Sequence, residues 1–299
     1  MMKLNIGYFA DGPWSHLAFQ KLIKNPDIKI SFICVRFDTK DQILRKYSSD
    51  YGIDLLKHEN INSKDFIKSI SRYECNLFVS MSFNQIFKKE IFNLPSLKTI
   101  NCHAGKLPFY RGRNILNWVL INDEKNFGVT VHFVDEGIDT GDIILQEIYQ
   151  INDDDDYSTL LKVAYVECAN VLYKAINLIK NQTVHTIKQK DIHPTGLYCP
   201  KRKTGDEILN WDQTTREVFN FIRAICKPGP MSTSFVNGKE IKINKAEIVK
   251  NMHFSNSSVG SVLKNDDKGV YIKTRDSCVL VTEFEFDGKL KVGDKLERK

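Results

Sequence analysis

Short apolar runs alternate with segments of helical periodicity over the first half of the chain, and this alternation constrains the fold more than any other feature. Strands are expected at 4–10, 28–37, 75–83 and 97–103. Helices are expected between them, at 14–24, 41–52 and 63–74. Apolar runs of strand length that alternate with amphipathic helices are typical of a parallel sheet covered on both faces. The sequence therefore predicts an α/β fold with a mostly parallel sheet.

The pattern changes toward the C-terminus. A helix at 112–122, strands at 128–137 and 142–151, and a long helix at 158–181 complete the α/β part. After one more helix at 215–226, short alternating runs follow one another, separated by the hairpin-type pairs Asn237-Gly238 and Asp287-Gly288. We predict three parts: an α/β domain at 1–182, a connector at 183–206, and a small, mainly β, OB-like domain at 207–299.

Composition and charge limit the partners. The chain of 299 residues has 43 basic and 37 acidic side chains, a formal net charge of +6. So small an excess, with the two signs interleaved, favours anionic ligands such as phosphates but does not by itself indicate nucleic-acid binding. No run of 18 apolar residues is present, and the first residues, MMKLNIGYFADGPW, lack the apolar run of a signal peptide. We expect a cytoplasmic protein that binds neither nucleic acid nor membrane.

The cysteines predict neither disulfides nor a metal site. The seven are scattered and form no CxxC pair, which is typical of reduced thiols. Cys102 and His103 are adjacent, but neighbouring residues of a strand point to opposite faces and do not share a metal. We therefore expect no metal.

The stretch INCHAGKLPFYRGRN, residues 100–114, places Asn101 and His103 at the end of an expected strand. Residues two apart in a strand share a face, so both side chains project together. A neutral imidazole accepts a proton near physiological pH, and an amide offers N–H groups to a developing oxyanion. The pair is suited to acyl-type chemistry at the carboxyl end of the strand, where ligands of such sheets bind.

Two further segments supply a group that orients the imidazole and a surface that binds the substrate. The turn VDEGIDTGD, residues 134–142, also falls at the expected carboxyl ends, and its Asp139 is placed to orient the imidazole of His103. The segment YRGRN, residues 110–114, adds two guanidinium groups at a helix start, which favours anion binding.

Each segment alone has a simpler explanation. Asn-x-His at a strand end is commonly a satisfied polar pair, and the acidic turn resembles many others, including calcium loops. Arg-Gly-Arg at a helix start is commonly a solvated basic turn. The segment FADGPWS is too poor in glycine for a dinucleotide fingerprint. The three segments in this order are much less probable as a coincidence.

In combination the segments resemble the 10-formyltetrahydrofolate-dependent formyltransferases, whose signature is Asn-x-His, a Leu-Leu-Pro-x-Tyr-Arg-Gly turn, a Gly-Val-Thr strand and an Asp-x-Gly-x-Asp-Thr-Gly loop. This chain has NCHAGKLPFYRG, GVTVHFVDEG and IDTGD in that order. The likeness continues through KRKTGDEILNW, residues 201–211, and so covers most of the chain. It departs at Gly105-Lys106, where the family usually has Ser-Leu. The resemblance implies a Rossmann-like formyltransferase core followed by the β-rich domain.

Three branches of the family are compared. The tRNA formyltransferases carry a long basic loop after the second strand, whereas this chain has the short segment RFDTKDQILRKYSSDYG. The glycinamide ribonucleotide formyltransferases are single domains with a glycine-rich phosphate loop that FADGPW does not match. The sugar-nucleotide N-formyltransferases keep two domains and a short loop, and commonly show YRGRxxxNWVL, as at 110–120 here. The resemblance favours the sugar-nucleotide branch.

This branch implies transfer of a formyl group from N10-formyltetrahydrofolate to the amine of a nucleotide-linked amino sugar, for a bacterial surface polysaccharide such as O-antigen. The acceptor implied is dTDP-4-amino-4,6-dideoxyglucose. Asn101 is expected to donate to the oxyanion, His103 to act as base or as imidazolium, and Asp139 to orient His103. A homodimer is implied as well.

Binding residues are also carried over by resemblance. The pterin ring is expected against Phe83, Gln85, Ile86, Phe87, Asp135, Gly137 and Ile138. The substrate is expected against Trp14, Arg111, Arg113, Asn114, Tyr198 and Lys201, with the two arginines at the diphosphate. Segment 83–87 is otherwise a strand end that runs into a helix, and Trp14 a core anchor.

Three rival functions are kept. Methionyl-tRNA formylation uses the same chemistry on a polyanion and predicts steep salt dependence. A non-catalytic sugar-nucleotide sensor would not need the imidazole–carboxylate pair of His103 and Asp139. A hydrolase would release formate from the folate without an amino sugar.

Overall fold

The computed structural model describes residues 2–249 and 256–298, and the chain forms two compact units. The first unit comprises Met1–Gly112, Phe127–Tyr149 and Lys162–Cys199. The second unit comprises Arg113–Asn126, Gln150–Leu161 and Pro200–Lys299. The predicted division at 1–182, 183–206 and 207–299 stays a prediction. Each compact unit is built from three separate segments of the chain, so the two divisions are not directly comparable.

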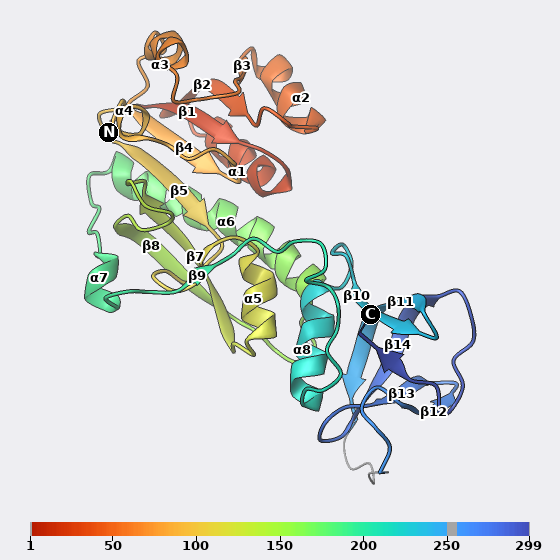
Figure 1. The fold of residues 1–299 in the computed structure, drawn as a ribbon. Helices are drawn as coiled ribbons and strands as arrows, with labels where there is room; N and C mark the ends of the chain where they lie inside the picture. Colours follow the sequence, from red (N-terminus) through yellow and green to blue (C-terminus); the bar gives the residue numbers. More distant parts are fainter. Residues whose placement is uncertain (1, 250–255, 299) are drawn as a thin grey trace. The chain divides into compact units, whose positions relative to one another are not determined.

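A seven-stranded sheet organises the first unit (Figure 1). Its strands are β1 (Leu4–Ala10), β2 (Ile28–Val35), β3 (Asp54–Lys57), β4 (Leu77–Met81), β5 (Thr99–His103), β7 (Asn126–Phe133) and β8 (Ile143–Gln150). They lie in the order β3-β2-β1-β4-β5-β7-β8, and the pairs from β3 to β5 are parallel. The prediction of a Rossmann-like, mostly parallel α/β core is confirmed. Only β3 was not expected, because none of its four residues is buried.

Helices lie between the strands of this sheet in the chain or follow its last strand, β8. They are α1 (Pro13–Ile23), α2 (Gln42–Tyr51), α3 (Lys64–Ser71), α4 (Lys89–Phe92), α6 (Tyr157–Lys180) and α7 (Gln189–Ile192). Helix α2 begins where the Asp41 side chain accepts the N–H groups of Ile43 and Leu44. It ends at Gly52, whose φ of 62° suits glycine.

Phenylalanines fill the core beside β1. The ring of Phe9 contacts those of Phe32, Phe66, Phe78, Phe83 and Phe87, with centroids 4.9 to 6.4 Å apart. Edge-on contacts of this kind stabilise a core beyond the burial of apolar area. They hold segment 83–87, which follows β4, at the carboxyl end of the sheet.

Strand β7 pairs with β5 in antiparallel orientation, unlike the strands from β3 to β5, and this determines which residues lie beside Asn101 and His103. It places Asn101 opposite His132 and His103 opposite Thr130. Segment 134–142 therefore starts beside Thr99, to whose carbonyl Val134 N donates at 2.8 Å, and not at the carboxyl end of β5. The expectation that this turn follows a parallel strand at that end is wrong. The turn instead folds back, so that Asp139 reaches His103.

Two very short strands, not expected from sequence, form a separate sheet within the first unit. Strand β6 (Arg111–Gly112) pairs in parallel with β9 (Tyr198–Cys199), with Arg111 opposite Tyr198. A side chain at Gly112 would lie 2.3 Å from the carbonyl oxygen of Cys199. Glycine at 112 thus permits the connector to pair directly with the turn after β5.

The second unit is a curled antiparallel sheet with two helices (Figure 1). The helices are α5 (Ile115–Ile121) and α8 (Thr215–Ile225), and the strands are β10 (Ser232–Val236), β11 (Lys239–Ile248), β12 (Val262–Asp266), β13 (Gly269–Lys273), β14 (Cys278–Phe286) and β15 (Leu296–Glu297). The sheet order is β12-β13-β14-β11-β10-β15, and a bridge between Ser261 and Lys295 joins its two ends. The predicted small, mainly β, OB-like domain is confirmed.

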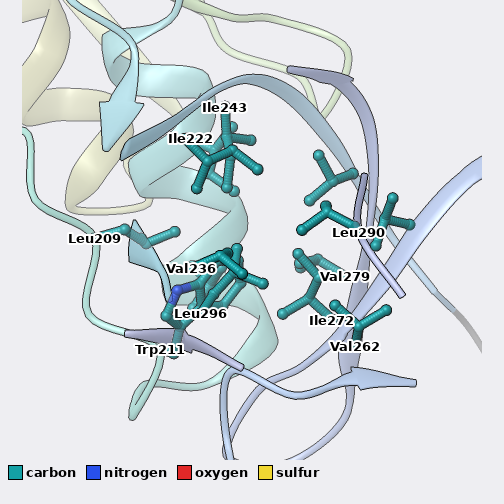
Figure 2. Close-up of a cluster of buried hydrophobic side chains, with 14 of the residues drawn as sticks. Leu209, Trp211, Ile222, Val236, Ile243, Val262, Ile272, Val279, Leu290 and Leu296 are labelled. Carbon is teal, nitrogen blue, oxygen red and sulfur yellow. The ribbon is translucent and has the colours of Figure 1, made fainter. Parts of the chain in front are cut away.

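Apolar side chains from the strands and from α8 meet inside the curled sheet (Figure 2). Trp211 lies among them, 3% exposed, and its Nε1 donates to Ser234 Oγ at 3.0 Å. Helix α8 starts with a capping box between Thr214 and Glu217, which satisfies its first N–H groups.

In the described ranges, 2–249 and 256–298, the structure contains no helix of sufficient length and apolar character to span a membrane.

Truncating Trp211 tests the core of the second unit. Trp211→Ala should lower the free energy of unfolding by about 3–5 kcal/mol, because it leaves a large cavity and removes the hydrogen bond to Ser234 Oγ. Urea denaturation followed by circular dichroism measures this loss. Val292→Ala, at a residue that is 67% exposed, is the matched control and should change the same quantity by less than about 0.5 kcal/mol. Equal effects of the two substitutions would contradict the packing described.

Candidate active site

The structure brings Asn101, His103 and Asp139 together in the first unit. Nδ1 of His103 lies 3.6 Å from Oδ2 of Asp139, and Nδ2 of Asn101 lies 3.4 Å from Oδ1 of the same carboxylate. The side chains of His103 and Asp139 are 10% and 14% exposed. Three groups from two distant segments thus form one cluster that is nearly, but not fully, removed from water.

Hydrogen bonds to both the main chain and the carboxylate of Asp139 fix its position. Its φ is 54°, in the left-handed region that aspartate tolerates better than most residues. Gly112 N donates to Oδ2 at 2.9 Å. The buried amide of Gln189 donates to the carbonyl oxygens of Asp139 and Gly141, each at 2.8 Å. The strained turn is therefore fixed by β6 and by α7.

The carboxyl of Asp139 remains ionised although it is buried. Burial alone would raise its pKa. The charge of His103 and the N–H of Gly112 act in the opposite direction and hold the pKa of Asp139 well below its usual range. The site therefore contains a fixed negative charge.

Both ring nitrogens of His103 face acceptors. Nε2 lies 2.7 Å from the carbonyl oxygen of Tyr110, and Nδ1 faces the carboxylate of Asp139. A ring that carries a proton on each nitrogen satisfies both acceptors at once. A neutral ring donates to one of these acceptors and an imidazolium to both, so the position fits either role of His103.

Gly105 makes room for this position of the ring. A Cβ at 105 would lie 2.4 Å from Nε2 of His103 and 2.5 Å from the carbonyl oxygen of Tyr110. The departure from the family's usual Ser-Leu at 105–106 is thus matched to the position of the imidazole.

Sequence reasoning missed His132, which completes the cluster. Its Nε2 lies 3.2 Å from Nδ2 of Asn101 and 3.5 Å from Oδ1 of Asp139. The side chain is 3% exposed. The alternation of Val129, Val131 and Phe133 on one face of β7 already places His132 on the other face. The missing information was which strand lies beside β7.

The segment expected to bind the pterin ring has mixed exposure. Phe87 is buried in the phenylalanine core, whereas Ile86 is 62% exposed. The amide of Gln85 is engaged on both atoms, because it accepts from Ile61 N and donates to the carbonyl oxygen of His58. Phe83 is half-buried against Phe9. Only Ile86 and part of Phe83 present apolar surface to a ligand.

Asn84, within the same segment, was not predicted. Its Nδ2 donates to Asp38 Oδ1 at 3.2 Å, while its Oδ1 is buried and accepts no hydrogen bond from any residue that the structure describes. A buried acceptor without a donor is uncommon in folded proteins. It is suited to a ligand that carries N–H groups.

The acidic turn has the same division between structural and exposed groups. Oδ1 of Asp135 accepts from Gly137 N at 3.1 Å and from Thr140 Oγ1 at 2.6 Å, which closes the turn. Gly137 is exposed, and Ile138 is 44% exposed. Asp135 therefore shapes the turn, and Ile138 is its free apolar side chain.

Arg111 and Tyr198 are adjacent across the pair of β6 and β9. The guanidinium of Arg111 donates to Oε1 of Gln189 from Nε and Nη2, at 3.0 and 2.7 Å, and from Nη1 to the carbonyl oxygen of Thr195 at 3.2 Å. Tyr198 is 53% exposed. Gln189, which also holds Asp139, thus fixes the orientation of Arg111; nothing in the sequence pattern of the connector indicated this role.

The other residues expected at the substrate are not part of this cluster. Trp14 is half-buried, and its ring packs edge-on against Tyr165 with centroids 4.8 Å apart. Arg113, Asn114 and Lys201 are exposed and belong to the second unit. There, Asn114 Oδ1 accepts from Arg202 N at 3.0 Å. Their binding roles stay predictions.

No group of three or more histidine, cysteine or carboxylate side chains arranged to hold a metal ion occurs in the part of the chain that the structure describes. The cluster has instead the ionised carboxylate of Asp139, the imidazole of His103 and the amide of Asn101. Such groups stabilise a developing oxyanion and move a proton, which suits acyl-type transfer between a carbonyl carbon and an amine.

Comparison with solved structures shows where the fold recurs. WlaRD, a sugar 3N-formyl transferase solved in the presence of dTDP and 5-N-formyl-THF, superposes with a TM-score of 0.68 at 23% identity, over 97% of this chain and 100% of that chain. The N-formyltransferase from Helicobacter canadensis, in complex with folinic acid and dTDP-3-aminofucose, gives 0.67 at 24% identity, over 95% and 100%. At these identities the likeness is one of fold.

Sequence relatives and family models identify the chain more directly. The methionyl-tRNA formyltransferase of Caldanaerobacter subterraneus subsp. tengcongensis is 33% identical over 267 residues, 89% of this chain and 82% of the relative. That of Azobacteroides pseudotrichonymphae is 34% identical over 257 residues, 82% of this chain and 78% of the relative. Residues 13–176 match the family described as formyl transferase, and residues 201–294 match the formyl transferase C-terminal domain. The chain belongs to the formyl transferase family, enzymes that transfer a formyl group.

Proposed function

We propose that this enzyme transfers the formyl group of N10-formyltetrahydrofolate to the amine of a nucleotide-linked amino sugar, for a bacterial surface polysaccharide. The observation that carries the proposal is the cluster of Asn101, His103 and Asp139, within 3.6 Å of one another through the carboxylate. The acceptor that we favour is dTDP-4-amino-4,6-dideoxyglucose. The alternative isomer is a 3-amino sugar, the kind of ligand bound to the Helicobacter canadensis enzyme.

The reaction joins the amine nitrogen to the formyl carbon and then breaks the bond from that carbon to N10. Asn101 donates an N–H group to the oxyanion that forms in between. His103, held as an imidazolium by Asp139 and the carbonyl of Tyr110, gives a proton to the departing N10. The neutral ring then takes the proton that the amine has to lose, so charges and protons balance over the cycle.

The residues around segments 83–87 and 135–139 fit the folate. Ile86 and Ile138 offer exposed apolar surface for a flat ring. The unpaired Oδ1 of Asn84 offers an acceptor, and a pterin ring carries N–H donors. Part of Phe83 is exposed as well, and Gln85, Phe87, Asp135 and Gly137 stay in the proposal as pterin contacts; Gln85, Phe87 and Asp135 also fix the shape of these two segments. The formyl group that the folate supplies is the one transferred.

Two observations favour a small acceptor over tRNA. Only residues 36–41 separate β2 from α2, and Arg36 donates to the carbonyl and hydroxyl oxygens of Ser82, so this loop does not offer a flexible basic arm. In the second unit, six exposed basic side chains are paired with carboxylates of the same unit at 2.5 to 3.8 Å. These pairs are Lys227–Glu285, Lys242–Glu240, Lys245–Glu283, Lys264–Asp266, Arg275–Asp212 and Lys295–Glu297. Paired charges contribute little attraction for a polyanion.

Arg111 is the residue we assign to the diphosphate. Gln189 and Thr195 orient its guanidinium and leave its remaining N–H donors for an anion. Tyr198, opposite it and half exposed, contacts the sugar or base. Trp14, Arg113, Asn114 and Lys201 stay in the proposal as further contacts, and the dimer stays as the proposed assembly.

The second candidate function is formylation of methionyl-tRNA. The relatives from Caldanaerobacter and Azobacteroides, at 33% and 34% identity, favour it. It uses the same cluster and differs only in the acceptor. An experiment that identifies the molecule that accepts the formyl group therefore distinguishes the two functions.

Incubation with 10-formyltetrahydrofolate and a panel of amines separates the two functions. The panel consists of dTDP-4-amino, dTDP-3-amino and UDP-4-amino sugars and methionyl-tRNA, and mass spectrometry detects the added formyl group. We expect one dTDP-linked sugar to be formylated, with Arg111→Ala raising its KM at least tenfold. Formylation of tRNA alone would overturn the choice of acceptor. Formate release in the absence of any amine would identify a hydrolase.

Removing the amide or the imidazole should abolish most of the rate. Asn101→Ala and His103→Ala should each lower kcat about 10²- to 10³-fold, the typical cost of losing one group that stabilises an oxyanion. Both should remain folded by circular dichroism, with a lower urea midpoint, because each removes a partner of the buried Asp139 carboxylate. His185→Ala, at an exposed histidine of the first unit, is the control and should keep full activity. Normal turnover by either site variant would contradict the assignment.

Asp139 should also link stability to pH. Because its pKa is lower in the folded than in the unfolded protein, the ionised carboxylate stabilises the fold above the unfolded pKa of about 3.9. This contribution is lost as pH falls toward the lower pKa of the folded state. The stability difference between the enzyme and Asp139→Asn should thus shrink as pH falls from about 5 to 3. Urea midpoints measure it; a difference that does not change with pH would contradict the pairing.

A further inference from the structure

His132 contacts two of the three groups that carry the proposed reaction and takes part in none of its steps. Its ring contacts the amide of Asn101 at 3.2 Å and the carboxylate of Asp139 at 3.5 Å. It is 3% exposed, against 10% for His103 and 14% for Asp139. The imidazole of His132 is thus the innermost member of the cluster, behind the groups that face solvent and substrate.

The surroundings of the ring determine its protonation pattern. Nδ1 lies 2.8 Å from the carbonyl oxygen of Phe133, which only accepts hydrogen bonds, so Nδ1 carries a proton. Nε2 has its nearer contact with Nδ2 of Asn101, which only donates. A neutral ring with a lone pair on Nε2 satisfies Phe133 and Asn101, and the contact of Nε2 with Oδ1 of Asp139, at 3.5 Å, is longer than either of these.

The amide of Asn101 is oriented by this contact. The distances between Asn101 Nδ2, His132 Nε2 and Asp139 Oδ1 are 3.2, 3.4 and 3.5 Å, a nearly equilateral triangle. Both acceptors therefore lie on one side of the amide nitrogen. The two contacts keep the nitrogen of the amide, and not its oxygen, on the side of these acceptors.

We propose that His132 is a positioning residue for Asn101: its neutral ring fixes the amide so that one N–H group is directed at the reacting carbonyl. The proposal rests on the proposed formyl transfer, because only there does that N–H group meet an oxyanion. The pairing of β5 with β7 fixes this contact, because Asn101 and His132 are directly opposite in register. Cross-strand neighbours of this kind have their side chains within contact distance.

The role differs from that of a catalytic group. His132 is too deeply buried to contact substrate, and its Nδ1 is committed to Phe133. It acts only through Asn101, whose amide would otherwise turn by half a rotation and present its oxygen instead of its N–H group. Buried groups that orient an active residue typically contribute one to two orders of magnitude in activity.

A double-mutant cycle in the formyl-transfer assay tests this. His132→Phe should lower kcat about 10- to 100-fold and change either KM less than about twofold. In the Asn101→Ala background the same substitution should cause less than about a twofold further loss, because the group through which it acts is gone. His132→Gln, whose amide oxygen can accept from Asn101, should recover part of the rate. His185→Phe is the matched control and should leave kcat unchanged.

The outcomes that oppose the proposal are distinct. Equal losses from His132→Phe in both backgrounds would show that His132 acts independently of Asn101. Unaltered kcat in His132→Phe would show that the amide needs no such partner. If His132→Phe does not fold, the comparison of His132→Gln in the two backgrounds carries the same test.

A second measurement does not depend on the acceptor. In protein labelled with ¹⁵N-histidine, the Nε2 signal of His132, assigned by its loss in His132→Gln, should be that of an unprotonated nitrogen and should shift in Asn101→Ala. A protonated Nε2 would overturn the proposal even if formyl transfer is confirmed. An unprotonated Nε2 in an enzyme that formylates none of the amines would leave the geometry intact and place the failure in the proposed function.

Discussion

A buried carboxylate has to be compensated, and the arrangement of the active site follows from how Asp139 is compensated. Its two oxygens face the imidazoles of His103 and His132, the amide of Asn101 and the N–H of Gly112. An isolated charge at this depth would be strongly unfavourable, so the partners stabilise the ionised form and are in turn oriented by it. The carboxylate thereby joins segments that are up to 38 residues apart in the chain.

The backbone supplies the complementary constraint. Asp139 reaches this place only because the turn after β7 folds back across β5, and Gln189 holds that turn through two carbonyl groups while it also orients Arg111. One buried glutamine therefore relates the group proposed to act on the proton to the group proposed to bind the diphosphate. The hydrogen bond from Gly112 N to the carboxylate of Asp139 joins the same two segments a second time.

Sequence reasoning reached the parts of this arrangement that depend on local periodicity. Asn101 and His103 share a face because they are two apart in a strand, and the alternation of strands and helices predicts the sheet. It did not reach His132 or Gln189. Their roles depend on which strands are neighbours and on where a connector returns, and both are long-range outcomes of packing. The direction of β7 is the clearest example: its apolar alternation is identical for parallel and antiparallel neighbours, so the pattern could not reveal that Asn101 faces His132.

Helices α5 and α8 pack in the same unit but are far apart in the sequence, which matters during synthesis of the chain. Helix α5 belongs to this unit, and the buried Nδ2 of Asn117 donates to the carbonyl oxygen of Ala224, 107 residues later in the sequence. During synthesis, the apolar face of α5 therefore leaves the ribosome long before α8 exists to cover it. The nascent chain must carry that face unprotected while the rest of the first unit is being made. We expect the interval between these two helices to be the stage at which the growing polypeptide depends most on chaperones.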